Sequence, residues 1–425
     1  MRVNPPVHRG RLFAVVTAVV LSVVTGLLIA ESSNASDGAD ASGSGAPVSD
    51  SAANAEQSPT TPTPTTSVDA AAPSVDADGW IVPKGTNIPM TPMKLGDTAP
   101  QFVIFSFDGA GRHDKMTEFL QAAAPTDSRF VGFLTGTYLL ADDHAGAYQG
   151  PGAEPGTSAV GFGGDLAEVE QRVNDLNTFY SLGNEIGTHY NGHFCDLGAN
   201  WSTAEWNSEL DQFFSWFSDW QSVNGVTDGP KLQVPPGEVQ GGRTPCLTGQ
   251  MDQLTPAWSQ HGMSYDSSGE NPFTGIAWPE QRDGIWQFPI PTVYSPAFVQ
   301  AGFSPLIKAM DYNFWFKFNE ATEDPASQPQ LTQIVLDTYR YMYQQTYNGN
   351  RAPILVANHF NDWNGNSFNP AALQFMQETC GQPETICTTY QDMIAWMDLQ
   401  DPKMLAKLQK LMPVADRDPN EQTTG

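Results

Sequence analysis

Basic residues are scarce in this sequence. Lysine and arginine together number 20 against 47 aspartates and glutamates, which gives a formal net charge of −27. A surface this acidic repels the phosphates of nucleic acids and anionic lipid headgroups, so neither is an expected partner. The charge is compatible with a neutral or amine-bearing substrate, although solubility alone is the commoner reason for it.

Cysteine is also scarce, and its spacing argues against the commonest thiolate metal motif. The four cysteines are Cys195, Cys246, Cys380 and Cys387, with no C-x-x-C pair among them. An even number in an exported chain favours two disulfides, with a thiolate metal site as the alternative. The chain also lacks an H-E-x-x-H motif, which argues against a metallopeptidase of that type.

A long apolar run occurs once, at residues 12–30, after Arg2, Arg9 and Arg11. This pattern indicates a secretory signal peptide or a signal anchor, to which we assign residues 1–35. The run is close to the ~20 residues that span a bilayer, so membrane attachment through an uncleaved anchor is the alternative to release. In either case we expect a secreted or cell-envelope protein.

Composition divides the rest of the chain into a linker, one domain and a tail. Residues 36–78 are rich in Ala, Ser, Asp, Pro and Thr, which bury little apolar area. We therefore expect a disordered linker there. Residues 79–400 are predicted to form a single domain, and residues 401–425 a C-terminal tail. The sequence does not indicate an oligomeric state.

Short apolar segments alternate with amphipathic ones through the predicted domain. Residues 101–107, 129–134 and 352–358 are apolar runs too short for helices and typical of buried parallel strands. The aromatic segment 312–318 is interpreted as a further strand. Residues 203–223 place large apolar side chains at three- and four-residue steps, as an amphipathic helix does. The alternation predicts parallel βα units and an α/β barrel.

Polar residues follow several of the predicted strands, namely Asp108, His189, Asp266 and His359. In α/β barrels, residues at the C-terminal ends of the strands build the active site. His189 is also followed, after three residues, by His193, and two imidazoles at this spacing can bind one metal ion. The sequence therefore predicts a metal-containing active site at one rim of the barrel.

Five short motifs in this order resemble those of the polysaccharide deacetylases, the NodB-homology group called carbohydrate esterase family four. The motifs are residues 103–109, Glu185-Ile186-Gly187 with the histidine pair, Arg243-Thr244-Pro245, Tyr265-Asp266-Ser267-Ser268, and 354–359. The resemblance covers residues 100–399 and implies a distorted (β/α) barrel with a single catalytic-type domain. It also implies an exported metal-dependent deacetylase, which removes N-acetyl or O-acetyl groups from a cell-wall or extracellular polysaccharide.

The resemblance implies a role for each polar side chain at the rim. Asp108 would be the general base toward water, and Arg243 would orient it. His359 would protonate the departing amine, while Asp266 would hold the imidazole of His359 in a useful tautomer.

The metal site departs from the family pattern. His189 and His193 would bind a divalent ion, for which zinc is expected because imidazole ligands suit it. The family's second aspartate, a metal ligand, falls on Gly109. A third ligand would have to come from another residue, and the candidates are Asp108, Asp114, Asp142, Asp143 and His144. The alternative function is therefore a catalytically weak or inactive deacetylase-like domain that binds carbohydrate.

The cysteines lie close to these motifs in the sequence. Cys195 follows His193 by two residues and Cys246 follows Arg243 by three, so both cysteines should lie on the active rim. We therefore predict a Cys195–Cys246 disulfide that joins the metal loop to the arginine loop. The other two cysteines would then close a short local loop.

Overall fold

The computed structural model of the protein describes residues 73–418. The predicted signal segment and most of the predicted linker lie outside these residues, so both stay predictions. In the described part of the chain, no helix combines the length and the apolar character needed to cross a bilayer.

A nine-stranded sheet lies at the centre of the domain, in the order β10-β1-β2-β3-β4-β5-β7-β6, with β11 paired to the first residues of β1. Neighbouring strands of this sheet run parallel to each other, except that β6 is antiparallel to β7. The strands, including the separate pair β8–β9, are β1 Gln101–Gly109, β2 Val131–Leu134, β3 Glu185–Thr188, β4 Gly241–Gly242, β5 Tyr265–Asp266, β6 Glu280–Arg282, β7 Ile285–Gln287, β8 Thr292–Tyr294, β9 Leu306–Lys308, β10 Ile354–His359 and β11 Thr385–Cys387.

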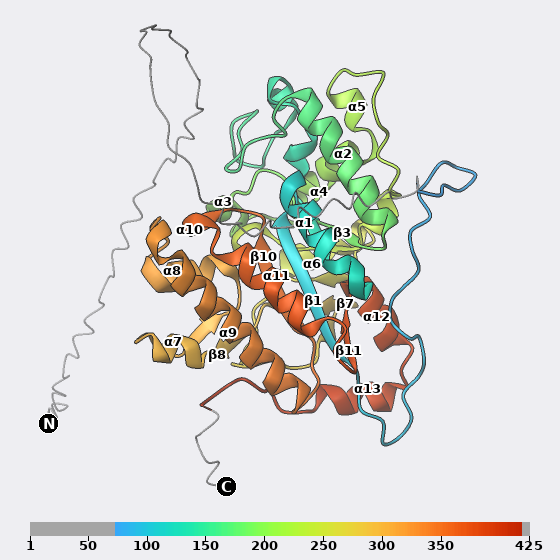
Figure 1. Ribbon diagram of the computed structural model, residues 1–425. Coiled ribbons are helices and arrows are strands. Elements are labelled where there is room, and N and C mark those ends of the chain that lie inside the picture. Colours follow the sequence, from blue (N-terminus) through green and yellow to red (C-terminus); the bar gives the residue numbers. More distant parts are fainter. Residues whose placement is uncertain (1–72, 419–425) are drawn as a thin grey trace, which may run out of the picture. The chain divides into compact units, whose positions relative to one another are not determined.

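Helices connect the parallel strands, as in a (β/α) barrel. They are α1 His113–Ala123, α2 Leu166–Ser181, α3 Cys195–Gly198, α4 Thr203–Ser218, α5 Trp220–Val223, α6 Met251–Gln260, α7 Pro296–Gln300, α8 Asp311–Asn319, α9 Gln328–Tyr347, α10 Trp363–Asn366, α11 Phe368–Thr379, α12 Tyr390–Asp398 and α13 Pro402–Gln409. The helices α2, α1, α11 and α9 pack against one another in that order beside β1, the long strand in Figure 1. The predicted distorted α/β barrel is therefore confirmed, and the described strands from β10 to β6 do not close into a full ring.

The centre of the sheet is packed with aromatic side chains. Phe107 of β1 is fully buried, and its ring stacks on Phe360 at 4.4 Å and contacts Phe119 of α1 at the same distance. This packing fixes the ends of β1 and β10 against each other, just where the predicted site residues begin.

The strand register aligns those site residues. Asp108 is paired with His359 across β1 and β10. Thr188, which precedes His189, pairs with Gly242, which precedes Arg243. Gly242 pairs in turn with Asp266. Because all these strands are parallel, the five side chains lie along the same C-terminal edge of the sheet.

The structure corrects three predicted elements. The segment 312–318, predicted as a strand, belongs to the helix α8, because only one side of its aromatic run is buried. The predicted helix 203–223 is broken at Asp219, whose carboxylate accepts the Ser222 N–H and starts α5. Part of the predicted tail is helical, since α13 covers Pro402–Gln409.

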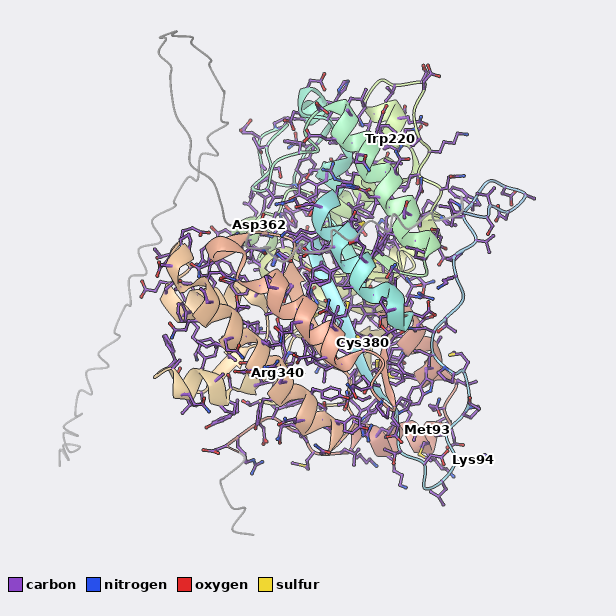
Figure 2. All side chains as sticks on the ribbon, viewed as in Figure 1. Met93, Lys94, Trp220, Arg340, Asp362 and Cys380 are labelled. Atoms are coloured by element: carbon purple, nitrogen blue, oxygen red, sulfur yellow. A yellow bond between two sulfur atoms is a disulfide. The ribbon has the colours of Figure 1, made fainter. Side chains whose placement is uncertain are left out.

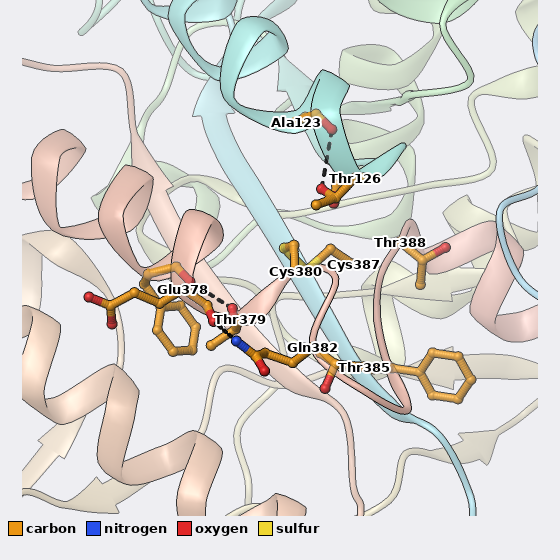
Figure 3. Close-up of a disulfide and its surroundings, with 12 residues drawn as sticks. Ala123, Thr126, Glu378, Thr379, Cys380, Gln382, Thr385, Cys387 and Thr388 are labelled. Carbon is orange, nitrogen blue, oxygen red and sulfur yellow. Dashed lines mark hydrogen bonds between the residues drawn. A yellow bond between two sulfur atoms is a disulfide. The ribbon is translucent and has the colours of Figure 1, made fainter.

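Both predicted disulfides are present. Cys195–Cys246 joins the start of α3 to the loop after β4, with Cα atoms 5.5 Å apart. Cys380–Cys387 joins the end of α11 to β11 (Figure 3). In Figure 2, Cys380 lies at one end of α11 and Asp362 lies near the other end. The second disulfide is therefore distant from the C-terminal edge of the sheet, where the predicted site residues lie. The thiolate metal site, which was the alternative, is therefore not the arrangement of these cysteines.

Candidate active site

A buried ion pair lies at the end of β1. The guanidinium Nη1 of Arg243 donates to Asp108 Oδ1 at 2.7 Å, and both side chains are at most 1% exposed. Burial disfavours the charged form of Asp108, but Arg243 and the nearby histidines together outweigh it and keep the pKa below its ordinary value. Asp108 is therefore ionised near neutral pH. The contact through which Arg243 would orient Asp108 is present, and the catalytic roles of both residues stay predictions.

Arg243 is held rigidly by groups on β1, β2 and α12 and by the residue that follows β5. Its Nη2 donates to the hydroxyls of Ser106, Ser267 and Tyr390, and its guanidinium lies 4.7 Å from the ring centroid of Phe133. With these donors occupied, Arg243 fixes the orientation of the Asp108 carboxylate. Asp108 Oδ2 is buried and has no hydrogen-bond partner among the described residues.

His359 faces this free oxygen. Its Nε2 lies 3.9 Å from Asp108 Oδ2, which is too long for a hydrogen bond and leaves both atoms available to a bound molecule. Its Nδ1 lies 2.9 Å from Oδ1 of Asp311, and its backbone N–H donates to Oδ2 of the same residue at 2.6 Å. Burial works against the imidazolium, but the carboxylates of Asp311 and Asp108 together outweigh it and raise the pKa of His359.

The prediction that Asp266 holds His359 is wrong, because Asp311 does so. The carboxylate of Asp266 instead accepts the backbone N–H groups of Ser268 and Gly269, both at 2.9 Å. These contacts close a tight turn after β5, a common use of aspartate. Burial raises the pKa of Asp266 to about 6.

The two histidines of the H-x-x-x-H motif lie together, with ring centroids 5.2 Å apart. His189 is buried, and its Nδ1 lies 2.8 Å from the carbonyl oxygen of Arg243. Because a carbonyl only accepts, Nδ1 carries the proton and Nε2 keeps its lone pair. That Nε2 is buried without a hydrogen-bond partner among the described residues. Burial lowers the pKa of His189 to about 3, so this lone pair is not protonated near neutral pH.

A buried network supports the loop between the two histidines. Glu209 of α4 accepts the hydroxyl of Tyr148 at 2.7 Å and the amide of Asn191 at 3.1 Å. The Tyr148 oxygen in turn accepts the N–H of Gly192 at 3.0 Å. His193 has φ of 55°, a left-handed conformation that a non-glycine residue adopts only when its surroundings enforce it.

None of the candidates for a third metal ligand completes this pair. Asp114 is exposed and pairs with Arg112, while Asp143 pairs with its neighbour His144. Among the described residues, the one group of three potential ligand side chains close enough to share an ion is His193 with Cys195 and Cys246, and those cysteines form the disulfide.

The backbone at Gly109, where the family pattern has a metal-binding aspartate, disfavours a side chain. Its φ is +86°, and a Cβ added there would lie 3.6 Å from the ring of Tyr138. A side chain would fit in space but would be strained by the backbone. The donor set therefore fits a divalent ion held by the two imidazoles, with the other coordination positions left to water or substrate.

No protein-family model and no curated protein matches the chain. Solved structures do resemble it. A protein described as a polysaccharide deacetylase from Mycobacterium smegmatis matches 78% of this chain and 99% of its own, at 14% identity and a TM-score of 0.43. The chitin deacetylase from the fungal pathogen Colletotrichum lindemuthianum matches 68% and 86%, at 12% identity and 0.35. A CE4 family pseudoenzyme from Bacillus anthracis matches 68% and 65%, at 10% identity and 0.30.

These structures bear the family name that the motifs indicated. The parallel strand order and the row of site residues along one edge agree with the distorted α/β barrel that the motifs implied. At 10–14% identity the likeness to the solved structures is one of fold alone. Whether this chain catalyses a reaction depends on its own side chains.

Sequence reasoning missed Asp311 and Glu209. Neither belongs to a motif, and Asp311 precedes the segment that was interpreted as a strand. One sequence signal could have revealed Asp311. It directly precedes the aromatic run 312–318, and an aspartate is common in the first turn of a helix.

Proposed function

We propose that the domain is an exported, metal-dependent carbohydrate deacetylase acting on an acetylated cell-wall or extracellular polysaccharide. The observation that carries the proposal is the distance of 3.9 Å between Asp108 Oδ2 and His359 Nε2. The other oxygen of Asp108 is bound by Arg243, and the other ring nitrogen of His359 is bound by Asp311. One of these groups is set up to accept a proton and the other to donate one. The two disulfides support an extracellular location.

Hydrolysis of an acetamide needs both proton transfers. Asp108, ionised through its contact with Arg243, accepts a proton from the attacking water at its free Oδ2. His359, whose imidazolium form is favoured by its contact with Asp311, donates the Nε2 proton to the leaving nitrogen. The products are acetate and a free amine on the sugar. The network around Arg243 keeps the base oriented throughout, since its partners are all buried.

His189 and His193 would hold the metal ion, with zinc as the expected ion. When bound, the ion would supply Lewis acidity toward the acetyl carbonyl and the attacking water. The Nδ1 contact of His189 to the Arg243 carbonyl orients the ring and presents Nε2 to the ion. Arg243 therefore contacts both parts of the proposed site: its backbone carbonyl binds the ligand His189, and its side chain orients the base Asp108.

A second candidate is a domain that binds carbohydrate without turnover. It is favoured by Gly109, because a two-imidazole site without a carboxylate binds divalent ions weakly.

Acetate release distinguishes the two candidates. The metal-supplemented protein and its Asp108→Asn and His359→Ala variants would be incubated with acetylated chitin oligomers and acetylxylan. Asp114→Asn, which alters an exposed carboxylate paired with Arg112, is the matched control. We expect release from the parent and the control, and a loss of about 100-fold or more in both site variants. Equal rates in the parent and the Asp108→Asn variant would exclude the proposed mechanism.

A further inference from the structure

A row of aromatic side chains leads outward from His359. The ring of Trp363 lies 4.7 Å from the imidazole, Tyr312 lies 5.6 Å from Trp363, and Phe316 lies 6.5 Å from Tyr312. Trp363 is half-buried, whereas Tyr312 is 44% exposed and Phe316 is 56% exposed. The row therefore runs without interruption from the proposed general acid to solvent.

The two outer rings belong to one face of α8. Tyr312 and Phe316 are four residues apart, which places them on the same side of a helix, and their rings are nearly parallel at 25°. The helix is anchored in the core by Phe314 and Trp315, which are 0% and 6% exposed. The helix is thus firmly packed while it presents two large rings to water.

This face has a fixed position relative to the proposed active site. Asp311, the first residue of α8, binds both the ring and the backbone of His359. Trp315 stacks on Trp363 with centroids 5.6 Å apart and planes inclined by 26°. The same short helix therefore orients the general acid and carries the exposed rings.

We propose that Tyr312, Phe316 and Trp363 form an aromatic platform that binds sugar rings of the polysaccharide beside the acetylated residue. This inference rests on the proposed function and adds a binding surface to it. Aromatic faces pack against the apolar faces of pyranose rings, while hydroxyl groups at the ring edge meet polar side chains. An uncharged ligand suits a chain with a net charge of −27 better than an anionic one.

The size of the platform favours a sugar chain over a protein partner. Large aromatic side chains have roughly 150–250 Å² of surface each, so two rings that are about half exposed offer roughly 200 Å². A stable protein interface needs about 800 Å² from each partner. A second copy of this acidic chain would also be repelled electrostatically.

Polar groups border the platform where it meets the sheet edge. Asp362, the neighbour of Trp363, accepts ion pairs from Lys115 at 2.8 Å and from Arg112 at 3.1 Å and is about half exposed. Figure 2 labels Asp362 on this side of the molecule. Such planar polar groups next to aromatic rings are the usual hydrogen-bonding partners of sugar hydroxyls.

Binding measurements on ring-deletion variants test the platform. The parent, Tyr312→Ala, Phe316→Ala and the control Val299→Ala would be titrated with N-acetylglucosamine, its β-1,4-linked hexamer and acetylxylan. Val299 is also an exposed apolar residue, 43% exposed, but lies on α7. We expect each ring deletion to weaken polymer binding by about 3- to 10-fold and monosaccharide binding less, with no change in the control.

The outcomes separate this inference from the proposed function. If the ring variants bind the polymers as tightly as the parent while the parent releases acetate, the platform is wrong and the deacetylase proposal stands. If the parent neither binds nor deacetylates any of the polymers, both are wrong. Because Tyr312 also contacts Trp363, its removal could disturb the fold, which circular dichroism would show. If Tyr312→Ala is misfolded, glycan binding by Phe316→Ala alone tests the platform.

Discussion

Asp311 holds His359 by two hydrogen bonds, one to the ring Nδ1 at 2.9 Å and one to the backbone N–H at 2.6 Å. The two residues are 48 positions apart, and the bridge between Met310 and Ala357 brings them together at the end of β10. With Nδ1 bound to a carboxylate, the Nε2 atom is directed toward Asp108. The position of the proposed acid is therefore set by a residue outside every motif.

Replacing Asp311 by asparagine should move the pH dependence of activity. The Asp311 carboxylate raises the pKa of His359 against the effect of burial, so its removal should lower that pKa. His359 would then lose its proton at a lower pH, and the alkaline limb of kcat/KM should shift to lower pH. The maximum should also fall, by about 10–100-fold. The pH–rate profiles of the parent and Asp311→Asn check this, with Asp337→Asn as the control.

An unchanged alkaline limb in an inactive but folded Asp311→Asn variant would contradict this explanation. Asp311 would then have a structural role at the start of α8 and no electrostatic one.

His189→Ala should abolish metal binding. His189 presents a buried Nε2 lone pair with no other partner among the described residues, so its removal leaves one imidazole. A single imidazole does not retain zinc through dialysis. Equilibrium dialysis followed by elemental analysis measures the stoichiometry, and His113→Ala, an exposed histidine on α1, is the control. Equal zinc in His189→Ala and the parent would show that the ion binds elsewhere.

Gly109 allows a test of the missing ligand with a built-in control. Both Gly109→Ala and Gly109→Asp should lose about 1–2 kcal/mol of unfolding free energy, because φ is +86°. Only Gly109→Asp adds a carboxylate, and we expect it to bind zinc about 10–100-fold more tightly than Gly109→Ala. Zinc titrations and urea unfolding separate the two effects. If both variants bind zinc equally, position 109 does not face the ion.

Glu209 and Glu185 should each lower the stability of the protein as the pH rises from about 5 to 7. Burial raises the pKa of Glu209 and of Glu185 to about 7, from 4.5. Over this range the folded chain keeps protons that the unfolded chain has released, so each group lowers the free energy of unfolding by roughly 2 kcal/mol. Glu209→Gln does not titrate, so its change in unfolding free energy between pH 5 and pH 7 should differ from that of the parent by about 2 kcal/mol. Urea unfolding at pH 5 and pH 7 measures it, and an identical decrease in parent and variant would refute the assignment.

Much of the fold followed from the sequence because its signals are local. The apolar runs before Asp108 and His359 mark buried strands, and polar residues directly after parallel strands must share one edge. Cys195 and Cys246 were paired correctly because each lies within three residues of a predicted rim residue, His193 or Arg243, and the other two cysteines then remained for each other.

The errors arose where tertiary contacts decide the outcome. The aromatic run after Asp311 could be a strand or a helix, and only burial of one side in the core decides for the helix. The partner of His359 depends on the β8–β9 pair and the loop that follows it, which carry no motif. Asp266 follows a strand like the other site residues, but its carboxylate serves a local turn.

Acetate release as a function of added zinc tests the central claim most directly. We predict that the parent releases acetate from an acetylated chitin hexamer or from acetylxylan, and that the rate rises with zinc to a plateau. His189→Ala should show no such rise, because its ion site is incomplete. A parent that is saturated with zinc and binds these glycans but releases no acetate would contradict the deacetylase account, and would leave carbohydrate binding as the function of this domain.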